Sequence, residues 1–551
     1  MSTVDEIAER YVPQVAELDP VTATMAGIAG HDDRMPDLTP AGFAARAELD
    51  RATITALRRL APADERERVA QAAMLERLAV AVELYDAGVV TSDINVIASW
   101  VQGVRQVFDL MPAEGEEAQR NLAARMAAVP GAYAGLRQTY AEAASQGRLA
   151  ARRQILACAR QCAEWSGSGD FYGDLVGRTG AEGALRTDLD RAAEAASAAT
   201  ASLGRFLETD LLPQAPERDA VGRDRYALAS RNFLGAVIDL DEAYAWGWEE
   251  VRRLRAEMTR VAGQIVPGGG LPEAIAALEA DPGRRINGRE NLRDWMQGFA
   301  DSAVADLNGT HFDIPEPARR IECMLAPTSD GGIYYTGPSE DWSRPGRMWW
   351  AVPDGVEEFS TWKEITTIYH EGVPGHHLQI AQAVFEQDRL NRWQRLLCWV
   401  SGHGEGWALY AERLMEELGY LSDPGNLLGM LDGQLLRAAR VVVDLGVHLQ
   451  LPIPGGTGWH DGETWNAELA WEFLRSLVQV EDDMLRFELN RYLGWPGQAP
   501  SYKLGERIWM QAREEARARQ GPAFDLRDFH RQALALGSLG LDPLREALAR
   551  L

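Results

Sequence analysis

Apolar residues recur three and four positions apart through most of the chain, which is the spacing of one face of an α-helix. The run EEAQRNLAARMAAVPGAYAGLRQTYAEAAS at 116–145 is one example, and similar runs rich in Ala, Leu, Arg and Glu fill the first 265 residues. Clusters of Pro and Gly interrupt them, notably LDPVTATMAGIAG at 18–30 and VPGGGLP at 266–272. The pattern predicts a mainly α fold.

The segment 318–353 departs from this spacing, because it is rich in aromatic residues, Gly and Pro. Its short runs RIECMLAP, GGIYYTG and RMWWAV predict three strands joined by turns. We therefore expect a small antiparallel β-sheet within residues 318–353.

The interruptions between helical runs are too short to be flexible linkers, and no repeat with a fixed period of 20 to 50 residues occurs. A repeat solenoid is therefore disfavoured. We expect one body over residues 1–551, in which a helical N-terminal part (1–265) and a second part (266–551) form sublobes.

Charge narrows the range of partners. The chain has 551 residues, of which 46% are hydrophobic and 25% charged, as in a globular protein. Its 82 acidic residues exceed its 56 basic ones, for a net charge of −26. The resulting field repels phosphate backbones and anionic membrane surfaces, so we expect neither a nucleic acid nor a membrane as partner.

The first residues of the chain and its cysteines bear on the compartment in which the protein is found. The first residues, MSTVDEIAERYV, lack the apolar stretch of a signal peptide, and no run of about 18 apolar residues occurs. The four cysteines are too sparse for a disulfide framework. Cys158 and Cys162 lie four apart in a helical run, which predicts small buried side chains on one face. We expect a cytoplasmic protein.

The stretch HEGVPGHH at 370–377 holds three of the nine histidines of the chain within eight residues. Neutral imidazole is a common ligand of transition metals. A Glu beside a ligand His, here Glu371 beside His370, is the arrangement in which zinc peptidases of the His-Glu-x-x-His type place their general base. The alternative is a histidine-rich helix end that binds no metal.

The spacing differs from that motif. Two ligands of one zinc lie about 3.3 Å apart, whereas residues six or seven apart on a continuous helix are displaced by about 9 to 10.5 Å. The helix must therefore be interrupted, and Val373-Pro374-Gly375 supplies the break. We favour His376 as the second ligand, because looping out two residues restores a motif-like arrangement; His377 is the alternative.

The chain at this point resembles the DUF885 family of bacterial metallopeptidase-like proteins, whose His-Glu-Gly-x-Pro-Gly-His-His sequence stands here as HEGVPGHH. Further family-like stretches are ELDPVTATMAGIAGHDDRMPDLTP at 17–40, EGWALYAERL at 405–414, RAARVVVDLGVH at 437–448 and RYLGWPGQAPSYKLGERI at 491–508. The resemblance implies a zincin-like active-site plan, similar to that of thermolysin, in a large helical body with a deep active-site cleft.

A catalytic zinc usually takes three protein ligands and leaves one position open. The resemblance implies a third ligand on a helix downstream of the histidines, and Glu405, which opens EGWALYAE, is our choice. Glu412 is the competitor; it lies about 10.5 Å further along the same helical face, so only one of the two can bind the ion. The other could orient a ligand. We expect His403 to be a surface or cleft residue.

The resemblance also suggests roles around the metal. Glu371 would be the general base, and Tyr502 and His448 are candidates to donate a hydrogen bond to the oxyanion. Arg491 would bind a substrate carboxylate. The histidine of the 376–377 pair that does not bind metal, His377 on our choice, would contact substrate or steady the site. Tyr335 lies in the run GGIYYTG, whose strand edge could bind an extended peptide.

Together these features predict a hydrolase of amide bonds in short peptides or peptide-like small molecules, with one Zn²⁺ per chain. One alternative is a metal-dependent biosynthetic enzyme that acts on a nonpeptide metabolite amide. A second is a helical binding protein that retains the fold without catalysis; the presence of Glu371 and the histidines argues against it.

Overall fold

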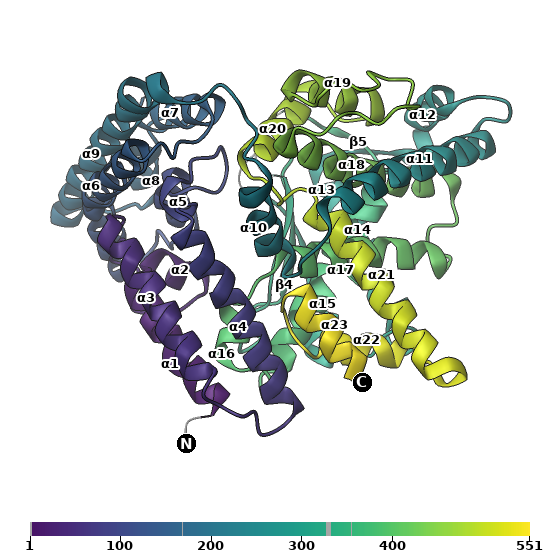
Figure 1. The fold of residues 1–551 in the computed structure, drawn as a ribbon, viewed down its shortest axis with the longest axis horizontal. Helices are drawn as coiled ribbons and strands as arrows, with labels where there is room; N and C mark the ends of the chain where they lie inside the picture. The colour runs from purple at the N-terminus through teal and green to yellow at the C-terminus, as the bar shows by residue number, and fades with distance from the viewer. Residues whose placement is uncertain (1–2, 168, 327–331, 354, 551) are drawn as a thin grey trace.

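The computed structural model describes residues 3–167, 169–326, 332–353 and 355–550. It is mainly helical, as the hydrophobic spacing predicts. Figure 1 shows helices α5 to α9 gathered at one side of the molecule, whereas the helices that follow α9 fill most of the other. In the part of the chain that the structure describes, no helix combines the length and the apolar character needed to cross a membrane.

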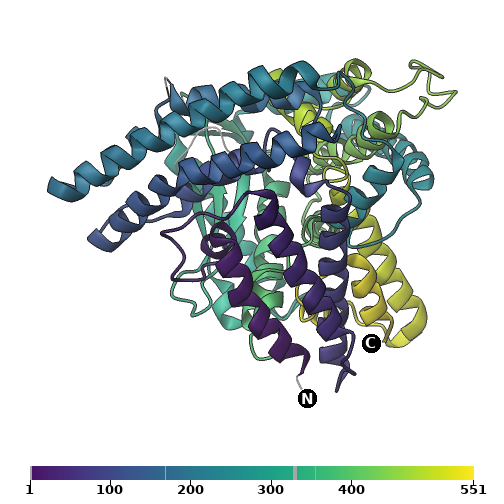
Figure 2. The same ribbon diagram turned by 60° about the vertical axis from the view of Figure 1, so that its left-hand side comes forward.

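The helices of the N-terminal part are α1 (Val4–Leu18), α2 (Pro20–Met25), α3 (Pro40–Leu57), α4 (Glu65–Asp86), α5 (Trp100–Gln106), α6 (Glu116–Ser145), α7 (Arg152–Ser166), α8 (Phe171–Arg178) and α9 (Gly183–Phe206). The capping box of Thr3 and Glu6 starts α1, since each side chain accepts a hydrogen bond from the other residue's backbone N–H. Helix α6 spans the run 116–145 that the sequence predicts to be helical, and it packs along α9 (Figure 2).

Two hydrophobic clusters divide this part of the chain. Helices α5 to α9 surround one of them, whose buried residues lie between Val21 and Leu212 and include Cys158 and Cys162, as predicted. Helices α1, α4, α10 and α11 pack instead into the main cluster, together with the C-terminal half. The division into sublobes near residue 265 stays a prediction.

The helices after α9 are α10 (Arg223–Leu234), α11 (Leu240–Ile265), α12 (Leu271–Ala280), α13 (Arg289–Leu307), α14 (Glu364–Glu371), α15 (His376–Phe385), α16 (Arg392–Leu396), α17 (Ser401–Glu417), α18 (Pro424–Leu449), α19 (Ala467–Leu477), α20 (Asp482–Gly494), α21 (Ser501–Gln520), α22 (Leu526–Leu534) and α23 (Leu541–Arg550). Helix α18 is buried along nearly its whole length, with α11, α14 and α21 packed against it. It therefore forms the centre of the main cluster.

The predicted small sheet is present as β2 (Ile321–Leu325), β3 (Ile333–Thr336) and β4 (Gly346–Trp350), in the order β2-β4-β3. Residues 327–331, where the first predicted run ends and the second begins, lie outside the described residues. A further antiparallel pair joins β1 (Arg285–Asn287) to β5 (Glu358–Ser360).

The prediction that the strands are all antiparallel is wrong for one pair. Strand β4 pairs antiparallel with β3 but parallel with β2. The reason lies in the strand order, because β3 runs opposite to both β2 and β4, and the two strands that share a direction are neighbours. Strand β4 buries alternate residues (Gly346, Met348 and Trp350), whereas no residue of β3 is fully buried. The most buried strand takes the centre of the sheet and leaves β3 at an edge.

Candidate metal centre and active site

The histidine helix is interrupted where the sequence predicts. Helix α14 ends at Glu371, α15 begins at His376, and the peptide bond between Val373 and Pro374 is cis. Gly375 packs so tightly that a Cβ there would lie 1.9 Å from the carbonyl oxygen of His370. Only glycine allows this approach, which returns the chain to the end of α14.

The loop brings the rings of His370 and His376 together, with centroids 4.8 Å apart at an interplanar angle of 90°. From α17, the Oε2 atom of Glu405 lies 3.4 Å from Nε2 of His370 and 3.3 Å from Nε2 of His376. Ligand atoms about 2.0 to 2.1 Å from a tetrahedral zinc are separated by about 3.3 Å. The spacing of Glu405 from both histidines therefore fits three ligands of one ion.

A second carboxylate competes for the third position. His370, Glu371 and His376 each offer an atom within 4.8 Å of the other two. Glu405 lies 3.3 to 3.4 Å from both Nε2 atoms, separations that suit a shared ion, so it is the better candidate for the third position. Glu371 then remains beside the centre with its carboxylate available for proton transfer.

Glu412 lies behind His370, as an orienting residue would. Its Oε1 is 2.7 Å from Nδ1 of His370, and its Oε2 accepts a hydrogen bond of 2.9 Å from Thr366 Oγ1. Because the Glu412 carboxylate accepts from Nδ1–H, Nε2, which faces Glu405, is the nitrogen of His370 that is left to bind an ion. Of the two candidate third ligands, Glu405 has the geometry and Glu412 does not.

His377 points away from His370 and His376. Its Nε2 donates to the carbonyl oxygen of Ala318 over 2.8 Å, and burial lowers its pKa to about 4, so the ring is neutral. Its Nδ1 must then accept a hydrogen bond from the Tyr335 hydroxyl, 2.9 Å away. Both ring nitrogens are occupied, so His377 holds Tyr335 in place, and it is not among the described residues that line the cavity around His370 and His376.

Burial and charge both act on the acidic and basic groups of the centre. Burial opposes the charged form of His370, but hydrogen bonds to Glu405 and Glu412 outweigh it and raise the pKa to about 10. For Glu405 burial opposes ionisation, yet the charges of His376 and His370 hold its pKa well below the usual range. Burial raises the pKa of Glu371. The centre therefore stabilises a positive charge held among its ligands.

These residues line a cavity of about 290 Å³. Its walls are formed by Ile333, Tyr334, Tyr335, His370, Glu371, His376, Ile380, Trp399, Glu405, Arg437, Arg440 and Tyr502. Trp399 is 51% exposed and stands near His376 at the rim. A larger cavity of about 640 Å³ lies elsewhere, and no histidine or cysteine is among the described residues that line it.

Tyr335 and Tyr502 line the cavity. Three other residues considered from the sequence are not among its described lining residues: His448, Arg491 and His403. His448 donates to the carbonyl oxygen of Tyr492, 3.0 Å from its Nε2. Arg491 pairs with Glu488 over 2.8 Å. His403 is buried against Gln379 and Trp509. The predicted roles of His448 and Arg491 therefore lack the geometry they need.

Several lining residues were not singled out from the sequence, among them Trp399, Arg437 and Arg440. The two arginines lie three apart on α18, within a run that is otherwise largely apolar. Cations spaced to share one face of a buried helix are a signal that could have identified them.

Close backbone packing sets the distance between α17 and α21. A Cβ on Gly406 would lie 2.4 Å from the carbonyl carbon of Gly505, so the two helices touch through their glycines. The candidate ligand Glu405 directly precedes one glycine, and Tyr502 is three residues before the other. Both side chains are thereby brought to one cavity.

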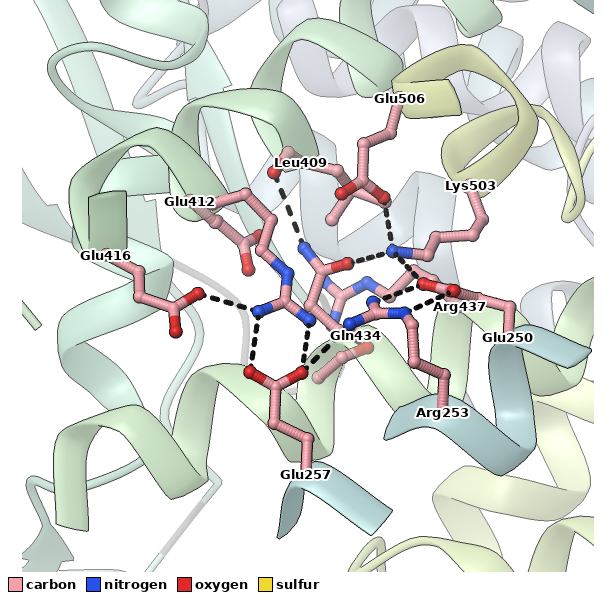
Figure 3. A network of polar contacts seen from close by, with 12 residues as sticks. Glu250, Arg253, Glu257, Leu409, Glu412, Glu416, Gln434, Arg437, Lys503 and Glu506 are labelled. Atoms are coloured by element: carbon pink, nitrogen blue, oxygen red, sulfur yellow. Dashed lines mark hydrogen bonds and ion pairs between the residues drawn. The ribbon is translucent and has the colours of Figure 1, made fainter. Parts of the chain in front are cut away.

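A network of charged side chains joins α17 and α21 to α11 (Figure 3). Arg413 of α17 pairs with Glu416 over 2.7 Å and with Glu257 of α11 over 3.1 Å. Lys503 of α21 pairs with Glu250 of α11 over 3.1 Å. The acidic and basic side chains of the network compensate one another, so we interpret the network as a structural support.

Comparisons with known proteins agree with this fold. A lipoprotein-like chain of Colwellia psychrerythraea, described as a "putative lipoprotein", has a similar structure with a TM-score of 0.84 and 22% identity over 100% of this chain and 99% of that one. A protein of Shewanella oneidensis, described in the same words and as of unknown function, matches with a TM-score of 0.76 and 17% identity, over 99% of each chain. At these identities the likeness concerns the fold alone.

No curated protein matches the chain significantly. The family model described as "Bacterial protein of unknown function (DUF885)" matches residues 20–548, which is nearly the whole sequence. The chain therefore belongs to the DUF885 family.

Proposed function

We propose that this protein is a zinc-dependent hydrolase of amide bonds in short peptides or peptide-like small molecules. One observation carries the proposal: a single carboxylate oxygen of Glu405 lies 3.3 to 3.4 Å from Nε2 of both His370 and His376. Two imidazoles and one carboxylate are the ligand set of many catalytic zinc sites.

The residues fit a divalent cation in chemistry as well as in spacing. The donors are two nitrogens and one oxygen, which suits zinc, and His370 is held by Glu412 in the manner usual for a metal-binding histidine. The raised pKa of His370, at about 10, indicates that the carboxylates around it favour a cation in their midst. One Zn²⁺ per chain, held by His370, His376 and Glu405, would polarise a substrate carbonyl and acidify a bound water.

Glu371 would act as the general base. It lines the cavity next to the ligands, and burial raises the pKa of its carboxyl group, which makes its carboxylate a better proton acceptor. It would take a proton from the attacking water and deliver it to the departing amine.

Tyr502 is the candidate donor to the oxyanion. It lines the same cavity, and its hydroxyl has no hydrogen-bond partner among the described residues. Burial, together with the charge of Glu405, raises its pKa to about 12, so the phenol keeps its proton and can donate a hydrogen bond.

The cavity favours small substrates. Its volume of about 290 Å³ lies at the lower end of ligand pockets, which span about 300 to 1,000 Å³. Strand β3, which carries Tyr334 and Tyr335 into the lining, lies at the edge of its sheet, where an extended peptide could add hydrogen bonds. The net charge of −26 disfavours nucleic acids and membranes as partners, and we infer a cytoplasmic location.

The test is metal content by elemental mass spectrometry on protein purified without added metal, for the wild type and for Glu405→Ala. Near one zinc in the wild type and far less in the variant supports the site. Chelator-sensitive hydrolysis is then sought in panels of dipeptides, N-acyl amino acids and metabolite amides. Failure to bind zinc at micromolar concentration would remove the hydrolase proposal.

A further inference from the structure

Arg437 is a cation in the cavity wall with unused hydrogen-bond donors. It projects from α18, is partly buried, and lines the cavity together with Glu371 and Tyr502. Its Nη1 donates to the carbonyl oxygen of Gly433 over 3.1 Å, while its buried Nε has no partner. It forms no ion pair with any residue that the structure describes.

The neighbouring arginines differ in this respect. Arg440, also in the lining, donates to the Tyr492 hydroxyl and pairs with Glu488, both over 2.7 Å. Arg491 pairs with Glu488 over 2.8 Å, and Arg413 is compensated by Glu257 and Glu416 in the network of Figure 3. Of these four cations, Arg437 alone lacks a carboxylate within ion-pair distance.

A partly buried guanidinium carries five N–H donors, and leaving several unpaired away from water is costly. Glu371, Glu412 and Asp432 attract Arg437 at longer range. None of them accepts a hydrogen bond from it among the described residues, so its planar pair of donors stays available. A carboxylate is the group that such a pair binds best, because two parallel hydrogen bonds then form.

We infer that Arg437 binds a free carboxylate of the substrate, so the preferred substrates are N-acyl amino acids and short peptides whose carboxylate lies near the scissile amide. The inference rests on the proposed function. The carboxylate and the reacting carbonyl share one cavity of about 290 Å³, which places them close together. The role that the sequence suggests for Arg491 thus passes to Arg437.

The test is a binding experiment that does not depend on turnover. Isothermal titration calorimetry on the Glu371→Gln protein would compare a panel of N-acetyl amino acids with their C-terminal amides. We expect the free acids to bind about 10- to 100-fold more tightly, the range that charge-assisted hydrogen bonds provide. N-acetylaspartic acid α-amide, whose only carboxylate is on the side chain, separates a terminal from a side-chain source.

Variants assign the effect to Arg437. In Glu371→Gln/Arg437→Met the preference for acids should disappear, and Arg437→Lys should restore part of it, because lysine keeps the charge but not the planar fork. The matched control is Arg507→Met, which removes an arginine of α21 that pairs with Glu242 away from the cavity. Measurements with and without added zinc separate binding by arginine from coordination to the ion.

The outcomes are distinguishable from those of the proposed function. Equal binding of acids and amides across the panel, or an acid preference that survives Arg437→Met, would overturn the inference. An acid preference that Arg437→Met abolishes, in a protein whose wild type hydrolyses none of these compounds, would support the carboxylate site and count against the hydrolase alone.

Discussion

The lobe of α5 to α9 and the layer formed by α14, α15, α17 and α18 bury different kinds of side chain. The core of the lobe is aliphatic and aromatic, with Cys158 and Cys162 packed as small apolar residues. The layer buries His370, Glu371 and Glu412 instead. Burying charged side chains is costly unless they are paired or bind a ligand. Hydrophobic packing therefore accounts for the residues buried in the lobe, whereas a binding or catalytic role accounts for those buried in the layer.

One arginine in each region shows the same difference between the lobe and the layer. Arg125 in the lobe is fully buried and donates to three backbone carbonyls and to a threonine hydroxyl, so it serves to hold chain segments together. Arg437 in the layer makes a single such contact. The comparison teaches that unused donors, more than burial or charge, separate a candidate binding residue from a structural one.

The largest effect is expected from His370→Ala, which removes one of the three proposed zinc ligands. Zinc should fall from near one per chain to almost none, because two remaining ligands hold the ion weakly. Elemental mass spectrometry would measure it. The control is Cys158→Ala, a core change in the lobe, which should keep the metal. Near-stoichiometric zinc in His370→Ala would show that His370 is not needed to bind zinc and would contradict the comparison of the two regions.

Glu371→Gln should keep the metal but lower kcat by about 100-fold or more, since the amide cannot accept the proton from water. The assay is hydrolysis of the best substrate from the panel, with zinc content measured in the same samples. Glu364→Gln, on the same helix but outside the cavity lining, is the matched control. Full activity in Glu371→Gln would exclude it from the mechanism.

The fold class and the break in the histidine helix can be predicted from the sequence, because each depends on residues that are close together in the chain. Helical spacing predicts the fold class, and the Pro-Gly break inside HEGVPGHH predicts the interruption that brings His376 beside His370. Both depend on residues close in sequence, where backbone geometry sets what can form.

Tertiary neighbours decide the rest. The parallel pairing of β2 with β4 follows from the order of the strands in the sheet, which spacing within a strand does not reveal. Orienting His377 requires the Ala318 carbonyl, 59 residues away. Arg491 is an exception, because its partner Glu488 lies one helical turn earlier and could have been recognised as an ion-pair partner.

Glu412→Ala should weaken zinc binding by about 10- to 100-fold, the usual effect of removing a residue that orients a metal-binding histidine. Competition with a chromophoric chelator measures the affinity. Glu416→Ala, one turn further along α17 and paired with Arg413, should leave it unchanged. If both variants bind zinc like the wild type, Glu412 does not orient His370.

Acid should destabilise the layer, together with helix α22, whose His530 contacts Tyr410 of α17, before it destabilises the lobe. Burial lowers the pKa values of His403 and His530 to about 3, below the ordinary value near 6.5, so both are neutral when folded and take up protons on unfolding. Their contribution is complete above pH 6.5 and is lost as the pH falls towards 3, by up to about 1.4 kcal/mol per pH unit for each histidine. Urea unfolding from pH 7 to 5 measures the slope, and hydrogen exchange shows where opening begins. If the backbone amides of α6 and α9 in the lobe exchanged before those of the layer, the predicted order of opening would be wrong.

The smallest effect on metal is expected at His377. His377→Gln should retain zinc like the wild type, because His377 faces Ala318 and Tyr335, whereas His376→Ala should lose it. Elemental mass spectrometry on the two variants side by side gives the answer. Equal zinc content in both would contradict the ligand assignment.

The contact between Gly406 and Gly505 has a consequence for how the site tolerates change. Since backbone meets backbone there, the spacing of α17 and α21 beside Glu405 and Tyr502 is set by contact between main-chain atoms and not by side-chain rotamers that can adjust. An added methyl group at either glycine would act as a spacer, moving the phenol relative to the carboxylate while leaving both side chains intact. These two positions therefore offer a means of varying alignment in the centre independently of its chemical composition.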